Sequence, residues 1–201
     1  MHEIMAKTAN TLLLVFLVVV LLAGCAAKKI PHEIVSDYGK RGMRLIAVMP
    51  VRHGSSDQKS AEMLRNKIIE ELYFKGYPRI PVKVIDEKLA AIAPESGGKA
   101  AAQRIGEMLG VDAVLYPVLN EGAMGSGLVY AATAVDAQLE LLSAKTGESI
   151  WRVQYRVVHR NWGFTRKQLE LKSSQVYEPA LQEVVNRALE TLPDGPDAVG
   201  P

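Results

Sequence analysis

The sequence predicts a single α/β (α+β) domain in which helices pack on one mixed β-sheet, in the order β-α-β-α-β-β-β-α. Short apolar runs alternate with segments whose apolar residues repeat every three or four positions, which is typical of strands and helices in turn. Two neighbouring segments late in the chain alternate apolar and polar residues, which indicates an antiparallel hairpin with one wet face. The length of 201 residues suits one domain with its own core.

The predicted domain covers residues 44–192 and begins with a buried strand at Leu45–Val51. A helix is expected from about Ser56 to Lys75, because its apolar residues repeat at helical spacing. Gly76 is expected to end this helix, since glycine is the preferred residue just past a helix C-terminus. The domain is therefore expected to begin with a strand and a helix that are joined by a loop.

The middle of the domain is predicted to contain a further strand, helix and strand. Alternation after two prolines predicts an edge strand at Val82–Ile85, followed by a helical turn at Leu89–Ile92. The alanine-rich segment Lys99–Leu109 predicts a helix with Gly110 as its left-handed cap. Asp112–Leu119 is almost entirely apolar, which favours a central strand.

The hairpin is the most closely specified part of the predicted fold. Residues 135–141 and 151–157 both alternate, and pairing Leu141 with Trp151 turns the apolar sides of both strands to the core. A slip by one residue would turn one strand inside out. This register also matches the polar side chains, because it places Glu140 opposite Arg152, Gln138 opposite Gln154 and Asp136 opposite Arg156.

The end of the chain predicts a loop, a helix and a tail. Residues 160–174 are polar and basic, and we expect either a loop pinned by Trp162 or a contact with a partner. The final helix is expected from about Ser174 to Leu192, with one apolar face. Residues 193–201 contain two prolines near the end of that helix and predict a flexible tail.

The N-terminus carries a strong indication of where the protein works. An uninterrupted apolar run, Leu12–Ala23, ends at Gly24 and Cys25. Its length matches the apolar region of a secretory signal, whereas a spanning helix, the alternative, needs about 20 apolar residues. The stretch Leu21-Leu22-Ala23-Gly24-Cys25 resembles the bacterial lipobox. The resemblance implies that residues 1–24 are a signal peptide and that Cys25 is acylated.

Cys25 is the only cysteine, so an intrachain disulfide is impossible and lipidation gives this residue a use. Each buried methylene contributes about 0.8 kcal/mol, so several acyl chains would hold the protein firmly at a membrane. By the same resemblance, Ala26 favours sorting to the outer membrane with the body facing the periplasm, while inner-membrane anchoring stays open. Residues 25–43 combine charge, Pro31 and glycines without periodicity, which predicts a lipidated cysteine followed by a tether.

One loop is a candidate ligand site. Arg52–Asp57 lies between the first strand and the first helix, where a helix N-terminus can hold an anion, and its candidate residues are His53, Ser55 and Ser56. The loop lacks the pattern of a phosphate loop, so turn and capping chemistry is the simpler interpretation. Gly122–Gly127 lies between strands with no helix after it, which favours a hairpin loop over a dinucleotide site.

Five short segments along residues 44–159 carry a resemblance to a known family: Ala47–Val51, Gly76-Tyr77, Pro81-Val82 with Val84–Asp86, Leu109–Tyr116, and Thr146–Glu148 with Trp151. In order and spacing they resemble the bacterial lipoproteins of the genome-derived neisserial-antigen type, whose function is largely unassigned. That family is distantly similar in fold to the amino-terminal domain of TolB and the periplasmic domain of CsgG. The resemblance implies a mixed sheet with helices packed on it and a role in envelope transport or assembly.

The sequence therefore predicts a lipid-anchored, non-enzymatic binding or scaffolding component of a cell-envelope transport or assembly system. The expected partners are the membrane, through acyl chains on Cys25, and an envelope protein; a homo-oligomer is also compatible. A net charge of +2 is too small to indicate nucleic acid. No catalytic residue, metal site or cofactor is predicted. The alternative is an enzyme or a small-ligand or anion-binding protein that uses the loop Arg52–Asp57.

Overall fold

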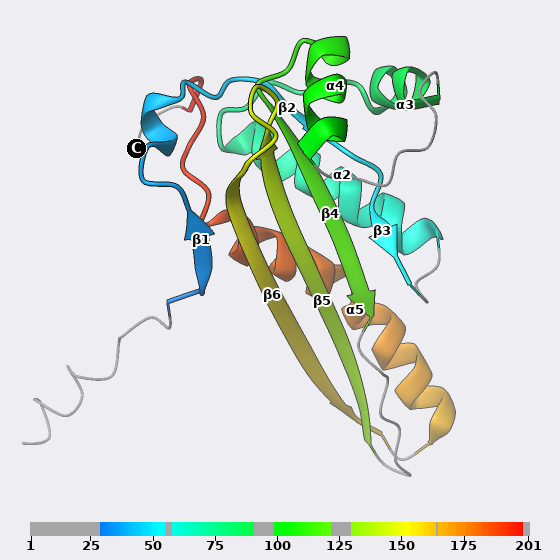
Figure 1. Ribbon diagram of the computed structural model, residues 1–201. Helices are drawn as coiled ribbons and strands as arrows, with labels where there is room; N and C mark the ends of the chain where they lie inside the picture. Colours follow the sequence, from blue (N-terminus) through cyan, green and yellow to red (C-terminus); the bar gives the residue numbers. More distant parts are fainter. Residues whose placement is uncertain (1–28, 55–57, 91–98, 122–129, 164, 199–201) are drawn as a thin grey trace, which may run out of the picture.

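Figure 1 shows the computed structural model, which describes residues 29–54, 58–90, 99–121, 130–163 and 165–198. The described residues form a mixed sheet of six strands with helices packed on it, so the predicted fold class is confirmed. In chain order the elements are β1 (His32–Ile34), the 3-10 helix η1 (Tyr38–Lys40), β2 (Ile46–Val48), β3 (Arg52–His53), α2 (Gln58–Phe74), α3 (Val82–Ala90), α4 (Lys99–Leu109), β4 (Ala113–Glu121), β5 (Tyr130–Ser143), β6 (Ser149–Trp162) and α5 (Arg166–Leu189).

The strands follow one another across the sheet in the order β1-β6-β5-β4-β2, and β3 pairs with β4 beyond the end of β2. β2 and β3 run parallel to β4, whereas the other pairs are antiparallel. The segment predicted as one strand, Leu45–Val51, is therefore divided. Met49 still donates its N–H to the carbonyl of Leu115, but Pro50 has no N–H to donate, and pairing resumes only at Arg52.

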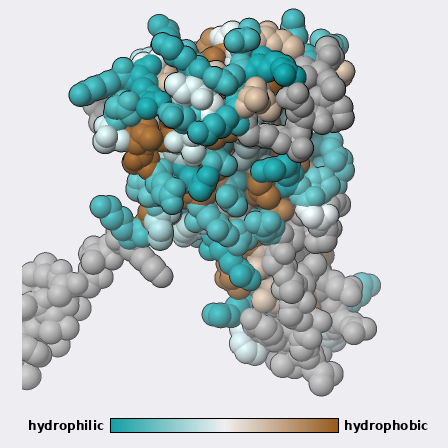
Figure 2. Space-filling model, in the orientation of Figure 1, coloured by the Kyte–Doolittle hydropathy of each residue, from teal (hydrophilic) through white to brown (hydrophobic). Residues whose placement is uncertain are grey.

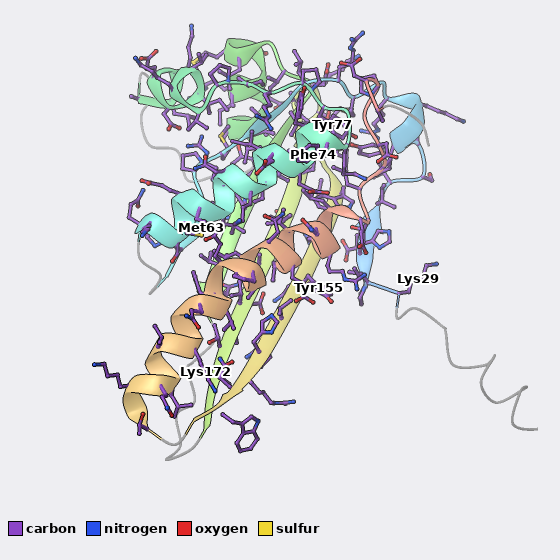
Figure 3. The ribbon with its side chains drawn as sticks, turned by 180° about the vertical axis from the view of Figure 1, so that it is seen from behind. Lys29, Met63, Phe74, Tyr77, Tyr155 and Lys172 are labelled. Carbon is purple, nitrogen blue, oxygen red and sulfur yellow. The ribbon has the colours of Figure 1, made fainter. Side chains whose placement is uncertain are left out.

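The sheet carries helices on both faces. α2 and α5 lie side by side over one face (Figure 3), where they enclose the larger core around Leu64, Leu141 and Trp151. α3 and α4 cover the β2–β4 part of the other face, where Ile85 lies in a smaller core. Alternation along β2 supplies both cores, because Ile46 and Val48 face the larger one while Ala47 faces the smaller. Apart from the Leu142 end of β5, which α4 reaches, no helix in the described ranges packs on this second face over β5 and β6, and Figure 2 shows mostly hydrophilic side chains over its middle.

The predicted hairpin register is confirmed. Leu141 pairs with Trp151, Glu140 with Arg152, Gln138 with Gln154, and Asp136 with Arg156. One detail differs from the charge matching of the sequence: the Asp136 carboxylate accepts from Gln154 Nε2 at 3.0 Å, diagonally across the strands. β5 and β6 each extend over 14 residues, well beyond the alternating core that specified their register.

The strand predicted at Val82–Ile85 is wrong, because this segment forms the first part of α3. Val84 and Ile85 both donate their N–H groups to the carbonyl of Pro81, so the helix begins at this proline. Proline is well tolerated there, because the first N–H groups of a helix have no intrahelical acceptor. Val82, Ile85 and Leu89 follow helical spacing equally well. Alternation over only four residues could not separate the two structures.

Both ends of the predicted domain are longer than expected. β1 pairs with β6, and Tyr38 is 5% exposed in the larger core, so residues 32–43, assigned to the tether, contribute to the folded body. At the other end, Gly195 donates its N–H to the Lys75 carbonyl at 2.7 Å, and Asp197 donates to Gly76 at 3.2 Å. Residues 193–198, assigned to a flexible tail, thus pack beside the C-terminus of α2. Segments this short have no periodicity by which a sequence could reveal them.

The loop expected at residues 160–174 is also wrong. β6 continues to Trp162, and α5 begins at Arg166 rather than near Ser174. Thr165 caps this helix by accepting the N–H of Gln168. The first two turns of α5 are too polar to show an amphipathic pattern, although Leu169 is buried.

Candidate functional site

The structure places the predicted site residues only in part. Arg52 and His53 form β3, with both side chains exposed at the edge of the sheet. Ser55 and Ser56 lie outside the described residues, as does Cys25, so the expected anion loop stays a prediction. Within the ranges that the structure describes, no group of three or more His, Cys, Asp and Glu side chains is arranged to hold a metal.

The buried face of α2 contains a charged side chain that the sequence analysis missed. Arg65 is 6% exposed, and its Nε and Nη2 donate to the carbonyl of Val48 at 3.1 and 2.9 Å. Its Nη1 donates to Asp86 Oδ2 at 3.0 Å, and Nη2 lies 2.8 Å from the other carboxylate oxygen. Arg65 therefore joins the end of β2 to α3. Its contacts are those of a structural clamp.

A concavity of about 550 Å³ lies between η1, α4 and the turn after β5. Its polar groups are largely engaged: Asp37 pairs with Arg41 at 3.0 Å, and Ser143 Oγ accepts the N–H of Thr146. Asp112 Oδ2 accepts the backbone N–H groups of Arg44 and Leu45 at 3.0 and 2.9 Å. The hydrogen bond from Arg41 lowers the pKa of Asp37. These pairings hold loops in place and bring no nucleophile next to a base.

The N-terminal entry to the domain is fastened by a pair of tyrosines. Tyr38 Oη lies 3.0 Å from Tyr77 Oη, and Tyr77 Oη donates to the carbonyl of Pro193 at 2.9 Å. Burial raises the pKa of both phenols, so both stay neutral at physiological pH. Figure 3 places Tyr77 beside the end of α2, on the same side of the molecule as the C-terminal segment. One hydrogen-bonded chain thus joins η1, α2 and residue 193.

The C-terminal segment makes three further contacts with this junction. Lys75 Nζ lies 2.6 Å from Asp194, and Arg44 lies 3.7 Å from Asp197. Gly76 has φ +86°, and a Cβ there would collide with the backbone of Ala198, so only glycine fits this approach. The entry and the exit of the folded body are therefore bound to each other.

The uncovered face of β5 and β6 carries three arginines of β6, spaced four residues apart, of which Arg152 is the first. Arg152 pairs with Glu140 on β5 and lies 3.9 Å from Glu33 on β1. The hydrogen bond to Glu140 raises the pKa of Arg152. Arg156 and Arg160 follow at spacings of four along β6, both exposed. This face therefore presents two exposed arginine side chains to solvent.

The family follows from the sequence match. A family model described as "Putative lipoprotein GNA1162-like" matches residues 36–194, which run from just before η1 to the residue after Pro193. The chain belongs to this family. The resemblance inferred from short segments is thereby confirmed. Among curated proteins, none matches this GNA1162-like chain.

Solved structures similar to this GNA1162-like chain come from several bacteria. Lipoprotein GNA1162 from Neisseria meningitidis is 21% identical over 68% of this chain and 96% of that chain, with a TM-score of 0.48. The PelC dodecamer from Paraburkholderia phytofirmans is 13% identical over 86% and 99%, with a TM-score of 0.45. The LpoB C-terminal domain from Escherichia coli is 22% identical over 58% and 82%, with a TM-score of 0.41. At these values the likenesses carry no argument about activity or partners.

The family description supports the prediction that the protein is a lipoprotein. In the described ranges of this GNA1162-like chain, no helix combines the length and the apolar character that crossing a membrane requires.

Proposed function

We propose that this chain is a lipid-anchored, non-enzymatic binding component of a cell-envelope transport or assembly system, held at the outer membrane by acyl chains on Cys25 and facing the periplasm. In this proposal residues 1–24 are removed as a signal peptide. Membership of a lipoprotein family and the lipobox-like stretch ending at the single cysteine support the anchor. Ala26 supports the outer membrane as the destination.

The observation that carries the proposal is the short distance between the anchor and the folded body. From residue 25 to residue 32, where β1 begins, the chain makes seven steps, which span at most about 25 Å. β1 is hydrogen-bonded to β6, and η1 is fastened through Tyr38. The body is then held within about one domain diameter of the bilayer, so it meets partners at the membrane surface rather than deep in the periplasm.

Binding fits the described polar groups better than catalysis does. Arg65, Asp112 and the Tyr38–Tyr77 pair all serve to join elements. The exposed arginines of β6, by contrast, lie on a part of the sheet face over which the described residues place no helix. Efficient catalysis needs a nucleophile or a proton donor oriented by neighbours, whereas a docking surface needs accessible, patterned side chains.

The anchor is tested by Cys25→Ser in cells, with fractionation of the envelope. We expect the variant to keep its signal sequence or to leave the outer-membrane fraction, while Ala26→Asp shifts the protein toward the inner membrane and keeps it membrane-bound. Normal maturation and normal fractionation of Cys25→Ser would refute the anchor.

The binding role is tested separately by crosslinking in intact cells with photoreactive residues on several surfaces of the anchored protein. We expect one surface to yield a reproducible heterologous envelope protein. Recovery of the monomer alone from every surface, with the anchor intact, would refute the binding role.

A further inference from the structure

The outer edge of β6, on the side away from β5, is covered by β1 over only part of its length. β1 pairs with residues 151–153 of β6, and no other strand in the described part of the chain pairs on that side. The rest of the strand runs on alongside β5, and from residue 154 to residue 161 its outer edge pairs with no strand that the structure describes; at Trp162 the carbonyl accepts from Lys172 Nζ. An open strand edge exposes N–H and C=O groups that can pair with another extended segment.

The register identifies the backbone groups that point outward. Val35 donates its N–H to the Ile150 carbonyl at 3.1 Å, so residue 150 faces the β1 side. N–H and C=O groups of alternate residues point to the same side of a strand, which assigns the β1 side to the even-numbered residues of β6. Beyond β1, the outward groups are therefore those of Gln154, Arg156, Val158 and Arg160.

The chain's own tether is unsuited to cover this edge. Extending the β1 register places Pro31 opposite Gln154, where an N–H would be needed, and Lys29 opposite Arg156. Like charges directly opposite each other on paired strands are destabilising. Within β1, by contrast, Glu33 lies opposite Arg152, so an acid faces the arginine where pairing does occur.

Side chains on the uncovered face define what the edge would accept. Arg156 and Arg160 are exposed, and no residue in the described ranges forms an ion pair with either. Val158 lies between them and is 44% exposed. A strand added here would place its own side chains opposite these three. The matching segment has an acidic residue, an apolar residue and an acidic residue at alternate positions.

We propose that the edge of β6 from Gln154 to Arg160 binds an extended acidic segment of an envelope protein by strand addition, in the pattern acidic–x–apolar–x–acidic. The inference rests on the proposed binding role and names the surface and the partner chemistry. A second copy of this chain is a poorer occupant, because antiparallel pairing centred on Val158 sets each Arg156 opposite an Arg160. The arginine pattern selects against self-pairing and for an acidic strand.

The test uses the full-length protein in detergent micelles and a synthetic eleven-residue peptide with the acidic–x–apolar–x–acidic pattern at its centre. Binding is followed by fluorescence anisotropy and by amide hydrogen exchange of β6. We expect slower exchange at Arg156, Val158 and Arg160, and about tenfold weaker binding when lysine replaces both acids. N-methylation of the peptide at its pairing positions should abolish binding without any change to the protein.

A charge exchange completes the test. The variant Arg156→Glu with Arg160→Glu should lose the acidic peptide and gain the lysine peptide, whereas Lys83→Glu with Lys88→Glu, which alters net charge equally on α3, should behave as the wild type. Equal binding of the acidic peptide to both variants, or unchanged exchange along β6, would overturn the proposal. If crosslinking in cells captures an envelope protein only from other surfaces, the binding role stands while this assignment fails.

Discussion

Replacing Arg65 by methionine tests whether the buried arginine stabilises the join between β2 and α3. The substitution removes both donors from the Val48 carbonyl, and a buried acceptor without a partner costs about 1–3 kcal/mol. Asp86 is 46% exposed, so water can replace its lost ion pair at a further cost of about 0–1 kcal/mol. The free energy of unfolding should therefore fall by about 1–4 kcal/mol, and Tm by about 2–16 °C.

Urea unfolding followed by circular dichroism measures this loss. Asp86→Asn is the matched variant: it weakens the ion pair but keeps both bonds to Val48, so it should cost less than 1 kcal/mol. The double variant should lose less than the sum of the two single losses, because the pair is broken only once. Methionine also avoids the cost of burying a guanidinium. A variant Arg65→Met as stable as the wild type would show that this saving outweighs the Val48 bonds and would refute the reasoning.

Two further predictions concern the junction of the chain ends. Because burial raises the pKa of Tyr38 and Tyr77, unfolding releases protons above about pH 10, and the free energy of unfolding falls as pH rises there. Tyr38→Phe should lower the free energy of unfolding by about 1 kcal/mol at pH 7 and should make that alkaline decline less steep. Unfolding measured from pH 9 to 11 tests this, and a slope equal to that of the wild type would contradict it. Gly76→Ala should displace Ala198 and destabilise the protein by about 1–3 kcal/mol with faster exchange at the C-terminal amides, whereas Gly39→Ala, with open space around it, should stay within about 0.5 kcal/mol.

Periodicity explains which parts of the fold the sequence could predict. The register of β5 and β6 was predictable because one residue of slip would have exchanged the buried and exposed sets, as with Leu141 and Trp151. Gly110 was predictable as a cap because a positive φ favours glycine, and its φ is 66°. α3 was missed because Val82–Ile85 fits both periods, and its start depends on Pro81.

Contacts between distant segments left weaker traces in the sequence. β1 and the Tyr38–Tyr77 bond join residues that are far apart along the chain and belong to no repeating pattern. Two signals could still have been used. Arg65 falls in the apolar row of α2, where a charge requires a buried partner, and Thr165 with Gln168 has capping-box spacing. Neither signal names the partner, since that depends on tertiary packing.

The proposed anchor and the proposed binding edge are joined through Pro31. β1 and the open part of β6 lie along one edge, and the chain enters β1 from the side of Arg156 and Arg160. A segment bound to residues 154–160 would therefore lie next to the residues that lead to Cys25. Since that stretch spans at most about 25 Å, the bound segment would itself be close to the bilayer. Lengthening the tether between Lys28 and Lys29 should then weaken capture of a membrane-bound partner in cells while leaving peptide binding in solution unchanged. Equal losses in both assays would mean that the tether supports the edge directly rather than setting its distance from the membrane.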